Sequence, residues 1–201
     1  MPISDWLPAS LVAAAAIRTV EADEALFRVD DRTHAVFDVI AGRIQLVRHD
    51  RGGRKLVLFA AGPGDSLAEP ALFSPRYHCD AVAVERATVR VYPKARVLAA
   101  LAADRSVALH CMAMLARQVQ HLRARLQIRD IRSARERVRQ HLALAAGPDG
   151  RTVALKGTLR DLAAELGLTP EALYRTLAAL AADREIERHH GSIVLRRPPA
   201  T

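Results

Sequence analysis

Residues 157–195 read GTLRDLAAELGLTPEALYRTLAALAADREIERHHGSIVL, and the signals in this stretch decide the fold of the C-terminal part of the chain. Thr158 is a favourable N-cap, apolar residues then recur at helical spacing, and Gly167 ends the pattern. Thr169 is a second N-cap, and Pro170 follows at the first helical position, where its missing N–H is not needed. The stretch therefore predicts two short amphipathic helices joined by a tight turn.

The end of the same stretch predicts a two-stranded hairpin. Residues 186–188 and 193–195 are alternating or apolar, and they flank the turn signal His190-Gly191. The simplest assembly of these elements is a helix-turn-helix followed by a wing. The tail after this hairpin, residues 196–201, is expected to be loose.

Polar side chains on the outer face of the second helix are candidates for reading DNA. Glu171 and Arg175 lie one turn apart, with Tyr174 beside them and Thr169 at the helix start. A glutamate accepts a hydrogen bond from cytosine and an arginine binds guanine, and both base edges lie in the major groove. The alternative is a solvated Glu/Arg pair that contributes roughly a few tenths of a kcal/mol. Because the caps, the turn glycine and the wing agree, we interpret this helix as a recognition helix.

This segment resembles the winged helix of the CRP/FNR family of bacterial transcription regulators. That family carries a Glu and an Arg four residues apart on its recognition helix, as Glu171 and Arg175 are here. Many cyclic-AMP-responsive members have an arginine just before the glutamate, where this chain has Pro170, so its half-site preference is expected to differ. The resemblance implies a transcription regulator that binds double-stranded DNA, with RNA polymerase as a further candidate partner.

Composition limits the other classes of protein. A chain of 201 residues, half of them hydrophobic, has enough material for two modest domains. The sequence has no run of eighteen apolar residues and no signal-peptide pattern, so we expect a cytoplasmic protein without a membrane partner. The two cysteines, Cys79 and Cys111, are too few for a disulfide framework or for the iron–sulfur cluster of oxygen-sensing relatives.

The positive charge is concentrated in the middle of the chain. The net charge is +8, and residues 105–139 contain nine Lys and Arg against two Asp and Glu. We therefore expect arginines just before the helix-turn-helix to attract DNA phosphates, with Arg135 as the candidate contact. The alternative is a solvated basic helix face.

Residues 104–131 predict one long helix that pairs with a second copy. Apolar residues step alternately by four and three, which is the 3.5-residue period of a coiled coil. These residues are Ala108, Met112, Leu115, Val119, Leu122 and Leu126, and the last five are the predicted dimer interface. The alternative is a single helix packed on its own domain. Ser133 and Glu136 have the form of a capping box that starts a new helix, so Ile131-Arg132 is the predicted hinge.

The N-terminal half predicts an antiparallel β-barrel or roll. Short strand patterns separated by glycine turns run from Leu26 to about Tyr92, the last two at residues 78–84 and 89–92, without intervening helices. The order of these patterns resembles the cyclic-nucleotide-binding β-roll of the CRP/FNR family. The predicted fold class is α+β, with a sensor roll at residues 1–103, a dimerisation coiled-coil helix and hinge at 104–131, and a winged helix-turn-helix DNA-binding domain at 132–201.

The resemblance also identifies a candidate effector pocket. Residues 67–73 occupy the place of the cassette that holds a cyclic phosphate, and Glu69 matches the ribose-binding glutamate. The family's Arg-Ser pair aligns with Tyr77 and His78, which leaves Arg76 as the only nearby cation. A buried phosphate needs a paired charge and hydrogen-bond donors, so cyclic AMP is not the expected effector. The cassette is more similar to the branch of the family that responds to nitric oxide or oxygen limitation.

Two further features bear on the effector. Cyclic-AMP binders supply a Thr-Ser pair from the long helix, where this chain has Leu122 and Arg123. Haem-bearing regulators that resemble this family take iron ligands from Cys, His or an N-terminal Pro, so His78, Cys79 and Pro2 are candidate haem ligands. The interpretation that we favour is that Cys79 lies in the core and His78 at the surface, because adjacent strand residues face opposite ways. The candidate pocket comprises Glu69, Arg76, Tyr77, His78, Cys79, Leu122 and Arg123.

The sequence therefore predicts a homodimeric transcription regulator that binds a palindromic operator under control of an effector sensed by the roll. One alternative is a haem-dependent gas or redox sensor, and another is a constitutive DNA binder whose roll is vestigial. An enzyme on a cupin-like barrel is not expected, because such enzymes gather a His-x-His motif around a metal ion and this chain has none.

Overall fold

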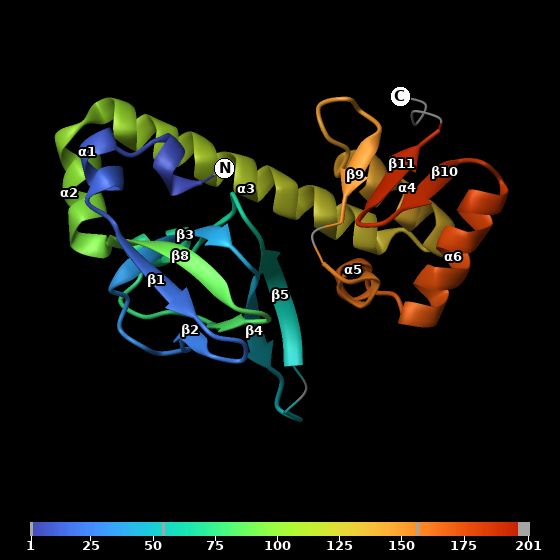
Figure 1. Cartoon of the computed structure of the whole chain (residues 1–201), viewed down its shortest axis with the longest axis horizontal. Helices are drawn as coiled ribbons and strands as arrows, with labels where there is room; N and C mark the ends of the chain where they lie inside the picture. Colours follow the sequence, from blue (N-terminus) through green and yellow to red (C-terminus); the bar gives the residue numbers. More distant parts are fainter. Residues whose placement is uncertain (1, 54, 156, 197–201) are drawn as a thin grey trace. The chain divides into compact units, whose positions relative to one another are not determined.

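The structure is a computed structural model that describes residues 2–53, 55–155 and 157–196, except for the side chain of Arg125. Residues 197–201 of the tail that was expected to be loose lie outside the described part. The chain divides into two compact units, one up to Arg117 and one from Gln118 onward (Figure 1). Among the described residues, no single helix is long and apolar enough to cross a membrane. The bent pair α2 (Lys94–Ala103) and α3 (Arg105–Asp130) passes that test on length and composition together.

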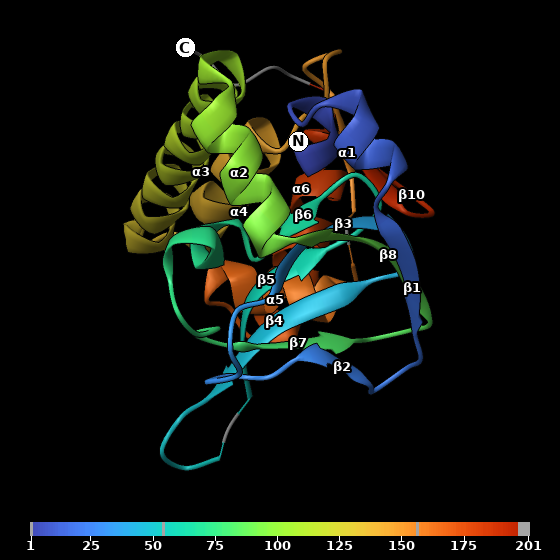
Figure 2. The same cartoon turned by 90° about the vertical axis from the view of Figure 1, so that its left-hand side faces the viewer.

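The first unit is built on two antiparallel four-stranded sheets (Figure 2). One sheet has the order β1 (Ala16–Val20), β8 (Ala87–Pro93), β3 (Ala35–Ala41) and β6 (Ser66–Leu67). The other has the order β2 (Ala25–Phe27), β7 (Asp80–Ala83), β4 (Ile44–His49) and β5 (Lys55–Ala61). Buried apolar side chains from both sheets form one core, which confirms the predicted roll.

The turn between β3 and β4 requires a glycine. Gly42 has a positive φ of 74°, and a Cβ atom there would lie 2.2 Å from the carbonyl oxygen of Arg86. Glycine alone adopts this conformation at low cost and leaves room for the neighbouring backbone. The glycine turn read from the sequence at this position therefore lets the chain pass from β3 in one sheet to β4 in the other.

Several elements of the first unit were not expected from the sequence. They are β1, the short helices η1 (Ile3–Asp5) and α1 (Ala9–Ala13), and α2 (Lys94–Ala103). In addition, the strand expected over residues 78–84 is shorter, because β7 begins at Asp80. The cassette forms a 3-10 helix, η2 (Glu69–Phe73), and the Lys94 ammonium donates to the carbonyls of Ala71 and Ser74 near its end.

A buried carboxylate holds the N-terminal segment on the roll. Asp38, on β3, is 2% exposed and accepts hydrogen bonds from the backbone N–H of Ile3 at 2.6 Å and of Ser4 at 2.9 Å. The Tyr92 hydroxyl donates to the same carboxylate at 2.9 Å. Because an unpaired buried carboxylate is costly, these three bonds explain both the burial of Asp38 and the docking of η1.

The long helix α3 (Arg105–Asp130) matches the predicted helix of residues 104–131 closely. Asp104 precedes it and accepts a hydrogen bond from the backbone N–H of Ser106 at 2.7 Å, as an N-cap does. Its first half contributes Val107, Cys111 and Met114 to the core of the roll.

The second unit is a winged helix-turn-helix, as predicted. Its helices are α4 (Ala134–Leu144), α5 (Leu159–Leu166) and α6 (Pro170–Ala182), and its strands are β9 (Thr152–Ala154), β10 (Ile186–His189) and β11 (Ser192–Leu195). The three strands form an antiparallel sheet in the order β10-β11-β9. A core of leucines and other apolar residues from all three helices holds the unit together.

Local capping explains where these helices begin and end. Thr158 and Asp161 form a complete capping box at the start of α5, and Gly167 ends that helix with φ at 63°. At α4 only half of the predicted box forms, because Ser133 accepts from the backbone N–H of Glu136 at 3.3 Å. The Glu136 carboxylate binds side chains further along the same helix instead.

Candidate DNA-binding and effector sites

Helix α6 separates a buried apolar face from an exposed polar one. Leu173, Leu177 and Leu180 are fully buried in the core of the second unit. Thr169 caps the helix by accepting from the backbone N–H of Ala172 at 3.2 Å. The apolar face fixes the rotation of the helix about its axis, because the three leucines recur at three- and four-residue steps.

The polar face of α6 carries the residues predicted to read DNA. Glu171, Tyr174 and Arg175 are all exposed, and Tyr174 has 49% of its surface accessible. Within the described part of the chain, Arg175 makes no ion pair, so its guanidinium is available to an acceptor. A carboxylate and a guanidinium one turn apart can address neighbouring bases in a major groove.

Arg135 has partners that the sequence did not predict. Its guanidinium contacts the carboxylates of Asp183 at 2.6 Å and of Glu185 at 2.5 Å. Hydrogen bonds to Glu185 and then to Asp183 raise the pKa of Arg135 above its ordinary value. A DNA phosphate would have to compete with two carboxylates for this group, which weighs against the predicted phosphate contact.

The wing offers basic side chains that the sequence analysis did not single out. Arg188 and His190 are exposed on the β10–β11 hairpin. The signal that could have identified them is their place beside the turn of a hairpin that directly follows the recognition helix. They are candidates for the phosphate contact expected from Arg135.

Most of the residues predicted at the dimer interface are exposed on α3. The exposed fractions are 57% for Met112, 48% for Val119, 57% for Leu122 and 62% for Leu126. Leu115 differs, because it is half-buried and packs against the core of the roll. The exposed stripe is distinct from the buried face of the same helix, so packing on the chain's own roll does not account for it.

The candidate effector residue Glu69 lies inside the roll. It is 4% exposed, and its carboxylate accepts a hydrogen bond from the Ser66 hydroxyl. Cys111 of α3 lies close enough for the Glu69 charge to raise the pKa of the thiol, although burial is the larger cause. In this structure the carboxylate is therefore directed to protein groups rather than to solvent.

Tyr77, which the resemblance aligned near the family's phosphate-binding arginine, is buried in the roll. It is 1% exposed, its hydroxyl donates to the carbonyl of Ala35 at 2.7 Å, and it accepts from the Ala35 N–H at 3.2 Å. Its ring stacks on Phe27 with 3.9 Å between the ring centroids. Arg76 is exposed and donates to the carbonyl of Asp30. The resemblance expects a phosphate-binding charge near this position, and the buried ring of Tyr77 supplies no charge to pair with a phosphate.

The candidate haem ligands are not brought together. His78 is exposed and Cys79 is 2% exposed, as the favoured interpretation expected. Pro2 precedes Ile3, which is fixed to Asp38 in the other sheet. Burial raises the pKa of the Cys79 thiol, which opposes the thiolate form that iron binds. The described residues contain no group of three or more His, Cys, Asp or Glu side chains placed to hold a metal ion. This set does not fit axial ligation of a haem.

Leu122 and Arg123, which stand in place of the family's Thr-Ser pair, are both exposed on α3. They belong to the second unit, whereas Glu69 and Tyr77 belong to the first.

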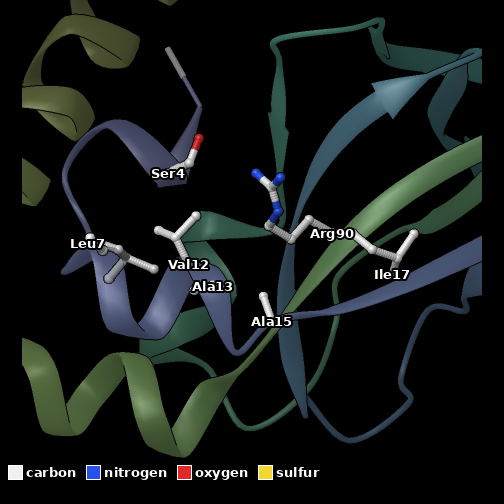
Figure 3. A pocket seen from close by; sticks show the side chains of 8 residues that line it. Ser4, Leu7, Val12, Ala13, Ala15, Ile17 and Arg90 are labelled. Carbon is white, nitrogen blue, oxygen red and sulfur yellow. The ribbon is translucent and has the colours of Figure 1, made fainter.

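One cavity of the first unit is not lined by Glu69. It has a volume of about 520 Å³ and lies beside α1 and the strands β1 and β8 (Figure 3). Arg90 is the only charged residue in its wall, and small apolar side chains such as Val12 and Ala15 form most of the rest. A second cavity of about 290 Å³ lies between the end of α3 and α4.

A roll, a long helix and a winged helix-turn-helix together define a class of DNA-binding regulators. Two family models match the chain: the cyclic nucleotide-binding domain over residues 17–104 and the Crp-like helix-turn-helix domain over residues 136–200. The chain belongs to the CRP/FNR family of transcription regulators.

Individual relatives agree with this assignment. The chain is 28% identical over 172 residues to the cyclic AMP receptor protein of Thermus thermophilus, a match that covers 85% of this chain and 79% of the relative. The structure of FixK2 from Bradyrhizobium japonicum matches with a TM-score of 0.76 and 26% identity, over 92% of this chain and 94% of that one. The c-di-GMP-responsive regulator CLP of Xanthomonas campestris matches with a TM-score of 0.66 over 94% of this chain and 99% of that one. Its 20% identity supports the fold alone.

Proposed function

We propose that the protein is a homodimer that binds a palindromic operator through α6 and regulates transcription there. In this proposal residues 1–103 are the sensor roll, residues 104–131 join two copies, and residues 132–201 bind DNA. The family is one of transcription regulators, so we propose no catalytic activity. We also propose a cytoplasmic location and a contact with RNA polymerase at the promoter, as expected for bacterial regulators that act on DNA.

The observation that carries the proposal is the polar face of α6. Glu171, Tyr174 and Arg175 are exposed on a helix whose opposite face is anchored by three fully buried leucines. A recognition helix needs this combination, because the base-reading side chains must be accessible while the helix itself stays fixed.

The direct test is selection of DNA from a random library, followed by footprinting. We expect a palindrome with two half-sites whose centres lie one helical turn apart, about 34 Å. Arg175→Ala should then lose preference at one guanine of each half-site. Recovery of DNA without any shared sequence would contradict the proposal.

The exposed stripe of α3 supports a homodimer. Val119, Leu122 and Leu126 expose large apolar surfaces at coiled-coil spacing, and contiguous exposed apolar surface of this kind marks an interface. Sedimentation equilibrium at micromolar concentration should give twice the mass of the chain. A monomer at that concentration would contradict the proposal that two copies bind a palindromic operator together.

The effector of the roll is proposed to be a molecule other than cyclic AMP or haem. The aromatic ring of Tyr77 and the dispersed candidate iron ligands support this choice. A thermal-shift screen of small molecules, with the absorption spectrum of the purified protein, tests it. A Soret band, or stabilisation by cyclic AMP, would overturn it.

The packed interior of the roll favours a second candidate function, a constitutive DNA binder with a vestigial sensor. Glu69 and Tyr77 are both buried and both satisfied by protein groups. This second function predicts that the purified protein, without any ligand, binds its operator with the affinity that regulation in cells requires. It also predicts that no ligand changes this affinity.

A further inference from the structure

One arginine of α4 connects the linker after α3 to the turn of the helix-turn-helix. The Arg137 guanidinium donates to the carbonyl of Ile131 through Nε at 3.0 Å and Nη2 at 2.6 Å. Through Nη1 it donates to the carbonyls of Leu166 at 3.0 Å and Gly167 at 3.3 Å. Ile131 lies between α3 and α4, and Gly167 lies two residues before Thr169, the N-cap of α6.

The end of α5 explains why an arginine suits this position. The last carbonyls of a helix lack intrahelical partners, and a cation near them is favourable. The planar guanidinium has five donors and can reach carbonyls on two segments at once, which the single ammonium of a lysine cannot do. A Cβ atom on Gly167 would lie 3.6 Å from the Arg129 side chain, so the last turn of α3 also reaches this turn.

A second set of contacts from α4 holds the other end of α6. Asp183 is the C-cap of α6, and Glu185 follows two residues later. Arg135 binds both carboxylates, and Arg139 binds Glu185 at 3.1 Å. Between these two sets of contacts, α4 packs against α6 through buried Val138 and Leu142.

We propose that Arg137, with the ion pairs of Glu185, fixes the direction of the recognition helix relative to the end of α3, and thereby sets the half-site spacing that the dimer accepts. Arg137 is then a positioning residue, because it acts through Leu166 and Gly167 rather than on a base. The inference rests on the proposed function as a dimer on a palindromic operator.

The physical reason is geometric. One base pair inserted between the half-sites moves the second by about 3.4 Å and rotates it around the DNA axis. A rigid pair of recognition helices cannot follow this change, so one helix loses its base contacts. Loosening the linker from the turn lets α6 reorient, which weakens binding at the preferred spacing and improves binding at others.

The test compares Arg137→Lys with Arg160→Lys, a control at an exposed arginine of α5 that also keeps its charge. The probe is the palindrome selected by the unmodified protein, together with versions that have one base pair added or removed at the centre. We expect Arg137→Lys to bind the original palindrome about tenfold more weakly and to lose about tenfold of the discrimination between spacings, the scale of one charged hydrogen bond. The dependence of DNA affinity on salt concentration should not change, because the variant retains the positive charge. Arg160→Lys should behave as the unmodified protein.

A second variant keeps the test decisive if Arg137→Lys does not fold. Glu185→Gln weakens the contacts at the other end of α6 and removes a negative charge, so general attraction to DNA should be equal or stronger. A flatter spacing preference with undiminished affinity cannot arise from unfolded protein. Circular dichroism at the assay temperature reports the folded fraction of both variants.

The outcomes separate this inference from the proposed function. If the unmodified protein selects no palindrome, the proposed function fails before any variant is made. If it selects one, and both Arg137→Lys and Glu185→Gln, when folded, keep the original spacing preference, the inference is overturned while the function stands. A flattened preference in either folded variant, with the control unchanged, supports the inference.

Discussion

The roll and the winged helix-turn-helix place their polar side chains in opposite ways. The buried polar side chains of the described residues are Asp38, Gln45, Ser66 and Glu69, and all of them lie in the roll. On α6 the polar side chains Glu171, Tyr174 and Arg175 are exposed. The roll buries four polar side chains, whereas the polar side chains on the outer face of α6 lie at the surface.

This difference bears on how each unit meets a ligand. DNA can reach Arg175 without any rearrangement of the protein. In the proposed function, a ligand of Glu69 has to enter the roll, where this side chain is 4% exposed, and replace its contact with Ser66. Opening the roll costs free energy that the ligand must recover by binding the open state more tightly. We therefore expect DNA binding to require less rearrangement than effector binding.

The largest expected effect concerns the helix that joins the two units. Leu122→Asp with Leu126→Asp would place like charges across the two-fold axis and cost the dimer about 5 kcal/mol or more. Both side chains are exposed in the single chain, so neither unit should unfold. Sedimentation should show a monomer without specific DNA binding. Gln120→Asp, which adds a charge outside the stripe, is the control, and a dimer that survives the double change would show that the interface lies elsewhere.

Leu115 is less suitable for that experiment. It packs against the core of the roll, so an aspartate there would destabilise the roll as well as the dimer. Loss of binding in a Leu115 variant would have two explanations.

Two tyrosines provide the next test, because one is buried in the roll and the other is exposed on α6. Tyr77→Ala should lower the free energy of unfolding by roughly 3–5 kcal/mol, since it removes a buried ring and leaves a cavity. Tyr174→Ala should change it by less than about 0.5 kcal/mol, because its site is on the surface. Urea denaturation measures both. Equal changes in the free energy of unfolding would contradict the conclusion that Tyr77 is buried in the roll while Tyr174 is exposed on α6.

Arg175 tests the outward-facing surface alone. Arg175→Ala should cost roughly 1–3 kcal/mol in operator binding and relax preference at one guanine, without a loss of stability. Glu171→Ala should reduce selection at a cytosine. Binding titrations on the selected palindrome and on single-base variants measure both effects. Arg135→Ala distinguishes the two roles considered for that residue. An equal loss of affinity for all DNA sequences, with a weaker dependence of affinity on salt concentration, indicates a phosphate contact. A lower free energy of unfolding indicates that the ion pairs with Asp183 and Glu185 are its main role.

The smallest expected effect concerns a turn of the second unit. Asp149 accepts hydrogen bonds from the hydroxyl and N–H of Thr152, and these lower its pKa from 3.8 to about 2. A depressed folded-state pKa contributes stability that is present above the ordinary pKa and lost as pH falls through the lower value. The melting-temperature difference between the unmodified protein and Asp149→Asn should therefore shrink between pH 4 and pH 2. A difference that is constant over this range would contradict the assignment.

The sequence alone determined the elements whose signals are local. Thr158 and Asp161, Gly167, and Thr169 with Pro170 are each within a few residues of the backbone groups that they satisfy, so the helix ends could be read directly. The period of the leucines on α3 and α6 also follows from neighbouring turns of one helix. The same reasoning gave the glycine turns of the roll, but it missed β1 and α2. The α2 segment is rich in alanine and has no side-chain N-cap, and β1 is a strand of only five residues.

Tertiary structure decided the contacts between segments that are distant in the chain. The hydroxyl of Tyr77 meets a backbone 42 residues away, Asp38 holds an N–H 35 residues away, and Arg135 meets Asp183 across 48 residues. Each side chain has several feasible partners until the fold brings one within reach, so its type alone does not specify a role. A buried polar group then takes whichever partner removes its desolvation cost, and that partner is known only once the chain has folded.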